Sequence, residues 1–92
     1  MSIRFQHKAY MADNTQALKT AVLAALAGDW HAAHNIAQDY SDVTACWLHA
    51  VLHKIQGDEG NSRYWYAKTG GKQFEHYADA NIELKEMLKQ LI

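Results

Sequence analysis

The dipeptide Gly-Asp occurs twice in this chain, at Gly28–Asp29 and Gly57–Asp58, and the chain contains no proline. Without proline, helices must end at glycines that take the left-handed conformation and begin at side chains that cap the free N–H groups of the first turn. A glycine followed directly by an aspartate therefore predicts the end of one helix and the start of the next. The two pairs indicate helices that follow one another closely, as in a stack of helical hairpins.

Apolar residues recur at helical spacing between these glycines. Five of them follow the i, i+3, i+4, i+7 and i+8 pattern of an amphipathic helix, namely Leu18, Ala21, Val22, Ala25 and Leu26. We expect this first helix to begin at a cap formed by Asp13 or Asn14 and to end at Gly28. Further helices are predicted within residues 29–40, 41–57, 58–71 and 78–92.

The size of the chain limits its architecture. A chain of 92 residues, of which 49% are hydrophobic, has room for one core rather than two. We therefore predict a single all-α domain over residues 1–92, with four to five short antiparallel helices as stacked helical hairpins and an irregular N-terminal arm at residues 1–12. Residues 41–57 carry apolar side chains around more than half of the helix, so we expect this helix to lie at the centre.

Charge and motifs limit which binding partners and which cellular location are expected. Nine basic and ten acidic residues are spread along the chain and give a net charge of -1, so a general polyanion-binding surface is not indicated. No segment has the roughly 20 apolar residues of a membrane span. The single cysteine, Cys46, cannot form an internal disulfide and no signal peptide is recognisable, which favours a cytoplasmic location. The TGGK sequence lacks the spacing of a phosphate-binding loop, and no cofactor is predicted.

The Gly-Asp turns resemble those at which the helices of tetratricopeptide-like hairpins begin. This resemblance implies a fold of stacked helical hairpins, although the chain lacks the W-x-x-L-G pattern and the closing proline of that repeat. Residues 47–71, WLHAVLHKIQGDEGNSRYWYAKTGG, are similar to a signature of small uncharacterised bacterial proteins that reads W-x-H-A-x-x-H, then Gly-Asp, then Asn and Tyr-Trp-Tyr. The second resemblance implies no activity.

Two histidines of the predicted central helix are candidates for chemistry. His49 and His53 lie four positions apart on one face, so they could share a divalent metal ion. A metal centre needs a further ligand, which would have to come from Asp58, Glu59 or His76, and the H-E-x-x-H pattern of zinc proteases is absent. The simpler interpretation is a polar, partly exposed strip that faces the next helix. A His-based metal-binding protein or metal-dependent enzyme is the alternative.

No chemical role is predicted for the other two histidines of this region or for the cysteine. His31 and His34 fall on the outward side of the helix at residues 29–40, so we expect both to be solvated. Cys46 is expected to be a small packed residue.

The favoured function is a non-catalytic module that binds a protein partner or a small ligand. Its predicted surface lies on the third and fourth helices and consists of His49, His53, Asn61, Tyr64 and Trp47. Trp65 and Tyr66 are expected to pack in the core, whereas Tyr64 points to another side of its helix. Two alternatives stay open. One is binding of single-stranded nucleic acid, in which a base stacks on Tyr64 near Arg63, Lys68, Lys72 and Phe74, and the other is self-association as a homodimer.

Overall fold

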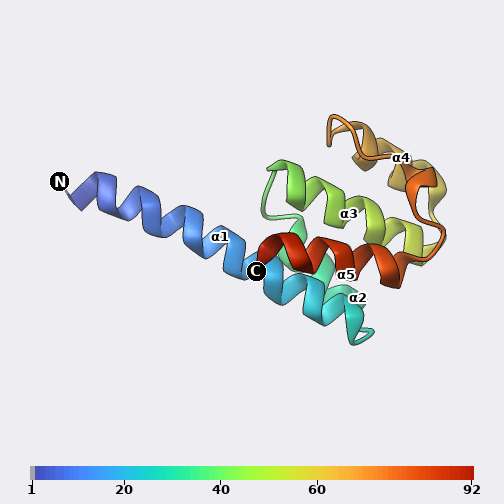
Figure 1. Ribbon diagram of the computed structural model, residues 1–92, viewed down its shortest axis with the longest axis horizontal. Helices are drawn as coiled ribbons and strands as arrows, with labels where there is room; N and C mark the ends of the chain where they lie inside the picture. The colour runs from blue at the N-terminus through green and yellow to red at the C-terminus, as the bar shows by residue number, and fades with distance from the viewer. Residues whose placement is uncertain (1) are drawn as a thin grey trace.

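The computed structural model describes the backbone of residues 2–92 and the side chains of residues 14–92. Five α-helices and one short 3-10 helix follow one another in this part of the chain, which contains no strand. They are α1 (Ser2–Leu26), α2 (Trp30–Ala37), α3 (Val43–Gln56), α4 (Glu59–Ala67), η1 (Phe74–His76) and α5 (Ala80–Leu91), as Figure 1 shows. The predicted all-α fold is confirmed.

The helices pair as two hairpins around α3. Helix α1 packs against α2, and α3 packs against α4, so each Gly-Asp turn joins the two helices of one hairpin. Helix α5 lies against both α1 and α3 (Figure 1). Because α3 contacts each of the other four α-helices, it is the central helix. This position was predicted from the apolar side chains around more than half of the helix.

The turns between the helices form as the sequence predicted. Gly28 and Gly57 have φ values of +88° and +83°, a conformation that residues with a Cβ atom rarely adopt. Asp29 and Asp58 each accept a hydrogen bond from the backbone N–H three residues later, at 3.2 Å in both cases. Asp42 caps α3 in the same way. These helix ends are therefore fixed by local chemistry that can be read from the chain.

The start of α1 differs from the prediction. The helix begins at Ser2, so the predicted cap at Asp13 or Asn14 is wrong, because no glycine or proline interrupts this 25-residue helix. The backbone of residues 2–12, where an irregular arm was expected, belongs to α1 and extends beyond the other helices (Figure 1). The amide of Asn14 instead donates to a carboxylate oxygen of Asp42 at 3.0 Å and thereby ties α1 to the start of α3.

One hydrophobic core holds the helices together. Its buried members are Leu18, Ala21, Val22, Ala25, Ala33, Ala37, Ala45, Trp47, Leu48, Ala50, Val51, Leu52, Tyr66, Leu84 and Met87. They include four of the five residues of the apolar stripe predicted for α1, and the largest share comes from α3. Burying one large aliphatic side chain contributes about 1.5–3 kcal/mol, so this core is the main source of stability.

An ion pair lies inside the fold between α3 and α5. The Nζ atom of Lys54 donates to Oε1 of Glu83 at 2.8 Å, and the two side chains are 8% and 1% exposed. The same Nζ atom donates to the backbone carbonyls of Phe74 and Tyr77, at 3.0 and 2.8 Å. The ammonium group thus uses its three hydrogens and fixes the loop between α4 and α5. Glu83 can be buried in α5 because Lys54 compensates its charge.

Glu83 also anchors two aromatic side chains. Its Oε2 atom accepts hydrogen bonds from Trp47 Nε1 at 2.8 Å and from the Tyr66 hydroxyl at 2.6 Å. Burial first, and then the bond and the charge of Glu83, raise the pKa of Tyr66 far above its ordinary value. Trp47 and Tyr66 therefore act as hydrogen-bonded core residues that join α3, α4 and α5.

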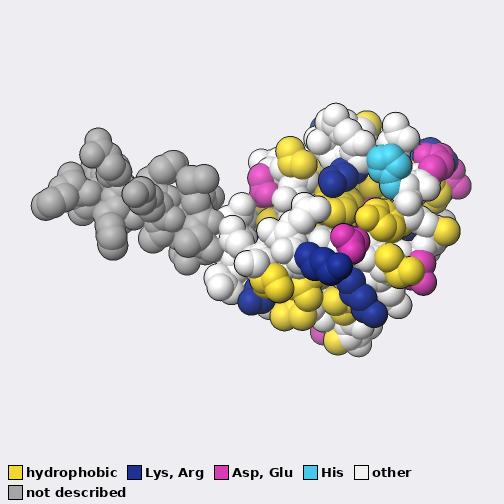
Figure 2. Space-filling model, viewed as in Figure 1, with side chains coloured by type: hydrophobic (Ala, Val, Ile, Leu, Met, Phe, Trp, Pro, Cys, Tyr) yellow, Lys and Arg dark blue, Asp and Glu magenta, His cyan; other side chains and the backbone are white. Residues whose placement is uncertain are grey.

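The surface is mixed in charge. On the face in Figure 2, basic and acidic side chains lie among one another with hydrophobic side chains between them. This distribution agrees with the net charge of -1. Within the described residues, no helix is both long enough and apolar enough to cross a membrane.

Candidate metal centre

Three histidines meet where α2 packs on α3. His34 lies on α2, whereas His49 and His53 lie one turn apart on α3. One ring nitrogen from each residue lies within 4.8 Å of the other two. His49 and His53 are 6% and 9% exposed, and His34 is half-buried. This group, here called the histidine cluster, is thus buried on the α3 side and more exposed at His34.

Two tryptophans fix the ring planes of the histidine cluster. Trp30 stacks on His34 with ring centroids 4.7 Å apart and planes at 10°, and Trp65 of α4 stacks on His49 at 4.0 Å and 10°. The Nε1 atom of Trp30 donates to the carbonyl of Leu52 at 2.6 Å, which holds this indole against α3. Because flat neighbours restrict both imidazoles, their nitrogen atoms point in defined directions.

The shortest distance between ring nitrogens in the histidine cluster is close to the distance between two nitrogen ligands of one zinc ion. His34 Nε2 and His49 Nε2 lie 3.1 Å apart. Two imidazole nitrogens on one tetrahedral zinc ion, each about 2.0–2.1 Å from the metal, lie about 3.3–3.4 Å apart. The pair is therefore close to the spacing of two zinc ligands, and in the metal-free protein one of these nitrogens donates its hydrogen to the other.

The third histidine is oriented by a neighbouring amide. His53 Nδ1 lies 3.0 Å from Oε1 of Gln56. With this oxygen as the acceptor, the hydrogen of the imidazole lies on Nδ1, and Nε2 keeps its lone pair. Metal-binding histidines commonly have such an outer hydrogen bond, which fixes the tautomer and the orientation of the ring.

The surroundings of the histidine cluster favour uncharged rings. Burial, followed by the nearby His34 and His53, lowers the pKa of His49 from its ordinary value to about 4. Burial, followed by His53 and His31, also lowers the pKa of His34. Both rings are therefore uncharged at neutral pH, which is the form of imidazole that binds a metal ion.

Several expectations for the histidines were wrong. His49 and His53 do not form a partly exposed strip, because α2 and α4 cover them with Trp30 and Trp65. His34 is not a solvated side chain but the third member of the histidine cluster.

The third possible metal ligand is also a different residue from those expected. The carboxylates of Asp58 and Glu59 and the ring of His76 do not belong to the histidine cluster. The sequence contained one signal for His34, since Trp30 lies four positions before it and therefore shares a face of α2. The prediction for His31 is confirmed, because this side chain is exposed.

The five residues of the predicted binding surface do not share one face. Trp47 is 2% exposed and bonded to Glu83, and the two histidines are buried as well. Asn61 is exposed, but its amide donates to the carboxylate of Asp58 at 2.8 Å and supports the start of α4. Tyr64 is 55% exposed and is the member of the set that presents a large side chain to solvent.

Comparison of the chain with protein-family models, with curated proteins and with solved structures finds no match. The resemblances to tetratricopeptide-like hairpins and to the signature at residues 47–71 therefore stay predictions. Among the described residues, the histidine cluster is the group in which possible metal ligands converge.

Proposed function

We propose that this protein is a small metal-binding protein that holds a divalent transition metal, zinc in the first place, through His34, His49 and His53. The observation that carries the proposal is the convergence of three ring nitrogens within 4.8 Å of one another. Three protein ligands with a water molecule in the fourth position are a common arrangement for zinc. The half-buried His34 gives the ion a way in from the α2 side.

Packing alone is a weaker explanation for the histidine cluster. Imidazoles that lie together in the interior oppose one another's protonation, as the lowered pKa values of His34 and His49 indicate. Burial of a polar ring is unfavourable unless its nitrogen atoms have partners. One metal ion could bind a ring nitrogen of each of the three histidines. The free energy of this binding would stabilise the folded chain.

We propose binding of the metal rather than a partner-binding surface as the role of these histidines. The interaction module that the sequence favoured requires His49 and His53 to be accessible, and both are buried. The side chains around the histidine cluster are Trp30, Trp65 and Gln56, which orient and shield the rings. Such surroundings suit a site that retains an ion.

The proposal is tested with untagged protein purified without chelators. We expect elemental analysis to find one zinc ion per chain, or metal-free protein to take up one Zn²⁺ in competition with a chromogenic chelator. His34→Ala removes a direct ligand, so its zinc affinity should fall by more than the roughly 10–100-fold typical for loss of an outer hydrogen-bond partner.

His31→Ala is the matched control, because His31 lies on the same helix but is exposed and outside the histidine cluster. Its zinc affinity should equal that of the unmodified protein, and circular dichroism verifies that both variants are folded. Absence of stoichiometric zinc in both experiments, or an equal loss of affinity in the two variants, would refute a metal site.

A further inference from the structure

A cavity of about 490 Å³ lies beside Trp65, at the start of α3 and along α4. Its volume is within the range of about 300–1,000 Å³ that is typical of small-molecule sites. The cavity is lined by Ser41, Cys46, Tyr64, Trp65 and Lys68, none of which belongs to the histidine cluster.

Two aromatic rings form a corner of this cavity. Tyr64 and Trp65 have ring centroids 5.3 Å apart and planes at 89°. Trp65 is fixed from behind by its stacking on His49, whereas Tyr64 is 55% exposed. A planar ring in the cavity can therefore lie against one aromatic side chain and meet the other edge-on, which is a favourable geometry for both contacts.

A positive charge lies over this corner. The Nζ atom of Lys68 is 4.9 Å from the ring centroid of Tyr64 and 5.9 Å from that of Trp65. No ion pair joins Lys68 to a carboxylate of the described residues. The ammonium group thus keeps its charge free for an anionic ligand.

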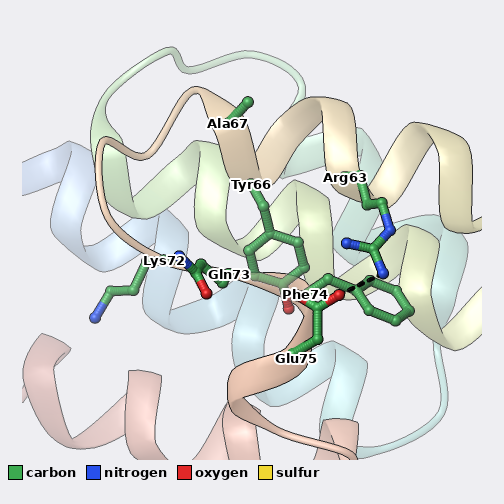
Figure 3. Close-up of a pocket in the computed structure, with 7 residues that line it drawn as sticks. All are labelled: Arg63, Tyr66, Ala67, Lys72, Gln73, Phe74 and Glu75. Carbon is green, nitrogen blue, oxygen red and sulfur yellow. Dashed lines mark ion pairs between the residues drawn. The ribbon is translucent and has the colours of Figure 1, made fainter.

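In a second cavity, of about 380 Å³, the arginine side chain is already paired with carboxylates. Figure 3 shows Arg63 reaching over Phe74 to Glu75, and the guanidinium lies 2.5 Å from that carboxylate. A second carboxylate, that of Glu59, accepts a hydrogen bond from Arg63 at 2.7 Å. Arg63 is thus neutralised by two carboxylates, one of which, Glu75, lines the cavity, and the second cation there, Lys72, lies over the ring of Trp47 at 4.1 Å. No carboxylate lines the cavity beside Lys68, so that cavity is the better anion site.

The floor of the cavity beside Lys68 is an uncharged thiol, although the carboxylate of Asp42 lies close to it. Cys46 is 5% exposed, its thiol donates to the carbonyl of Ser41 at 3.7 Å, and burial, followed by the charge of Asp42, raises its pKa. The nearby carboxylate of Asp42 already accepts hydrogen bonds from Asn14 and from the backbone N–H of Ala45.

We propose that the cavity lined by Tyr64, Trp65 and Lys68 binds a small planar aromatic anion, with its ring in the aromatic corner and its anionic group on the lysine ammonium. This site is separate from the proposed metal centre and does not require it. A carboxylate and a phosphate ester could both provide the anion, so the probes include one of each.

The test is a titration of ¹⁵N-labelled protein, both metal-free and in the presence of zinc, followed by the indole N–H signals of its tryptophans. The probes are indole-3-acetate, phenyl phosphate, the uncharged indole-3-acetamide, and acetate, which has no ring. We expect indole-3-acetate or phenyl phosphate to shift the Trp65 signal saturably, whereas the acetamide and acetate bind at least about fivefold more weakly.

Two lysine variants form a matched pair. Lys68→Met should weaken binding of the aromatic anion by about fivefold or more, because it removes the charge but retains the apolar stem. Lys72→Met is the control, since Lys72 lies over Trp47 at 4.1 Å and outside this cavity, and it should leave binding unchanged.

Equal affinity for the acid and the acetamide, or an equal effect of the two lysine variants, would overturn the proposal. Tight binding of a single-stranded oligonucleotide without binding of either small acid would also overturn it, in favour of a nucleic-acid surface. Loss of zinc binding in His34→Ala with unchanged titration of indole-3-acetate would separate the two sites.

Discussion

The Lys54 side chain compensates a charge that is buried inside the fold. Lys54 and Glu83 form an ion pair that is almost closed to solvent, and Glu83 keeps two further hydrogen bonds to core aromatics. Removing one partner of a buried ion pair is more damaging than removing both, because the remaining charge has lost its compensation. The position of Glu83 could not be predicted from helical periodicity, since its burial depends on a residue 29 positions away.

We expect Lys54→Met to lower the free energy of unfolding by about 3–5 kcal/mol. The control is Lys89→Met, which breaks the exposed ion pair of Lys89 with Glu86 and should cost no more than about 1 kcal/mol. Urea denaturation of both variants measures the difference. The double variant Lys54→Met/Glu83→Gln should regain part of the loss, and a Lys54→Met protein as stable as Lys89→Met would contradict this role.

At the scale of the helices, two glycines with different backbone conformations provide a comparison. Gly57 ends α3 at a φ of +83°, whereas Gly60 is the second residue of α4 and has an ordinary negative φ. A Cβ atom added at either position meets no atom within 4 Å. Any effect of alanine therefore comes from the backbone and not from a clash.

Gly57→Ala should destabilise the protein by about 1–2 kcal/mol, because an alanine is strained in the left-handed conformation. Gly60→Ala should instead stabilise it by about 0.5–1 kcal/mol, because alanine loses less backbone entropy in a helix. Thermal or urea unfolding of the two variants gives the sign of each effect. A Gly57→Ala protein at least as stable as the unmodified protein would show that the left-handed turn after α3 is not what ends this helix.

The helices were predictable where their ends depend on neighbouring residues. The Gly-Asp turns and the Asp42 cap need only a few adjacent residues, so they could be identified in the sequence. The start of α1 could not, because Asn14, which has the chemistry of a cap, is used in a contact with another helix. Asn14 could serve either as a helix cap or as a contact to another helix, and the position of Asp42 determines which of these it does.

At the scale of the whole molecule, the packing of α2 on α3 creates the histidine cluster. The sequence indicated the pair His49 and His53, which share a face of one helix. It did not indicate His34 as the third member, because the register between two helices is set by the shapes of all their contacting side chains. The burial of Trp47 likewise depends on which helix covers it, whereas the exposure of Tyr64 agrees with the side of the helix on which the sequence placed it.

The same packing predicts that metal-free protein is sensitive to acid. The pKa of His49 is about 4 in the folded protein and 6.5 is its ordinary value, so the unfolded chain binds more protons between these pH values. The free energy of unfolding should therefore fall by about 3 kcal/mol as the pH falls from 7 to 4, and His34, whose pKa is also lowered, acts in the same direction.

Urea denaturation of metal-free protein at several pH values between 7 and 4 measures this loss. In His49→Gln the loss should be smaller by most of that amount, because glutamine does not titrate. His31→Ala changes an exposed ring that is not among the causes of the lowered pKa of His49, so it should retain the part of the dependence that comes from His49. A stability that stays constant or rises toward pH 4 would be incompatible with a buried uncharged imidazole at position 49.

Trp65 belongs to both proposed sites, since one face of its indole lies flat on His49 and the side chain also lines the cavity beside Lys68. Any turn of the His49 ring toward a bound ion changes the wall against which an aromatic ligand packs. Thermodynamic reciprocity then requires that the ligand alter the affinity for the ion by the same factor as the ion alters the affinity for the ligand. If both proposed sites bind their ligands, this one indole would couple the two binding equilibria.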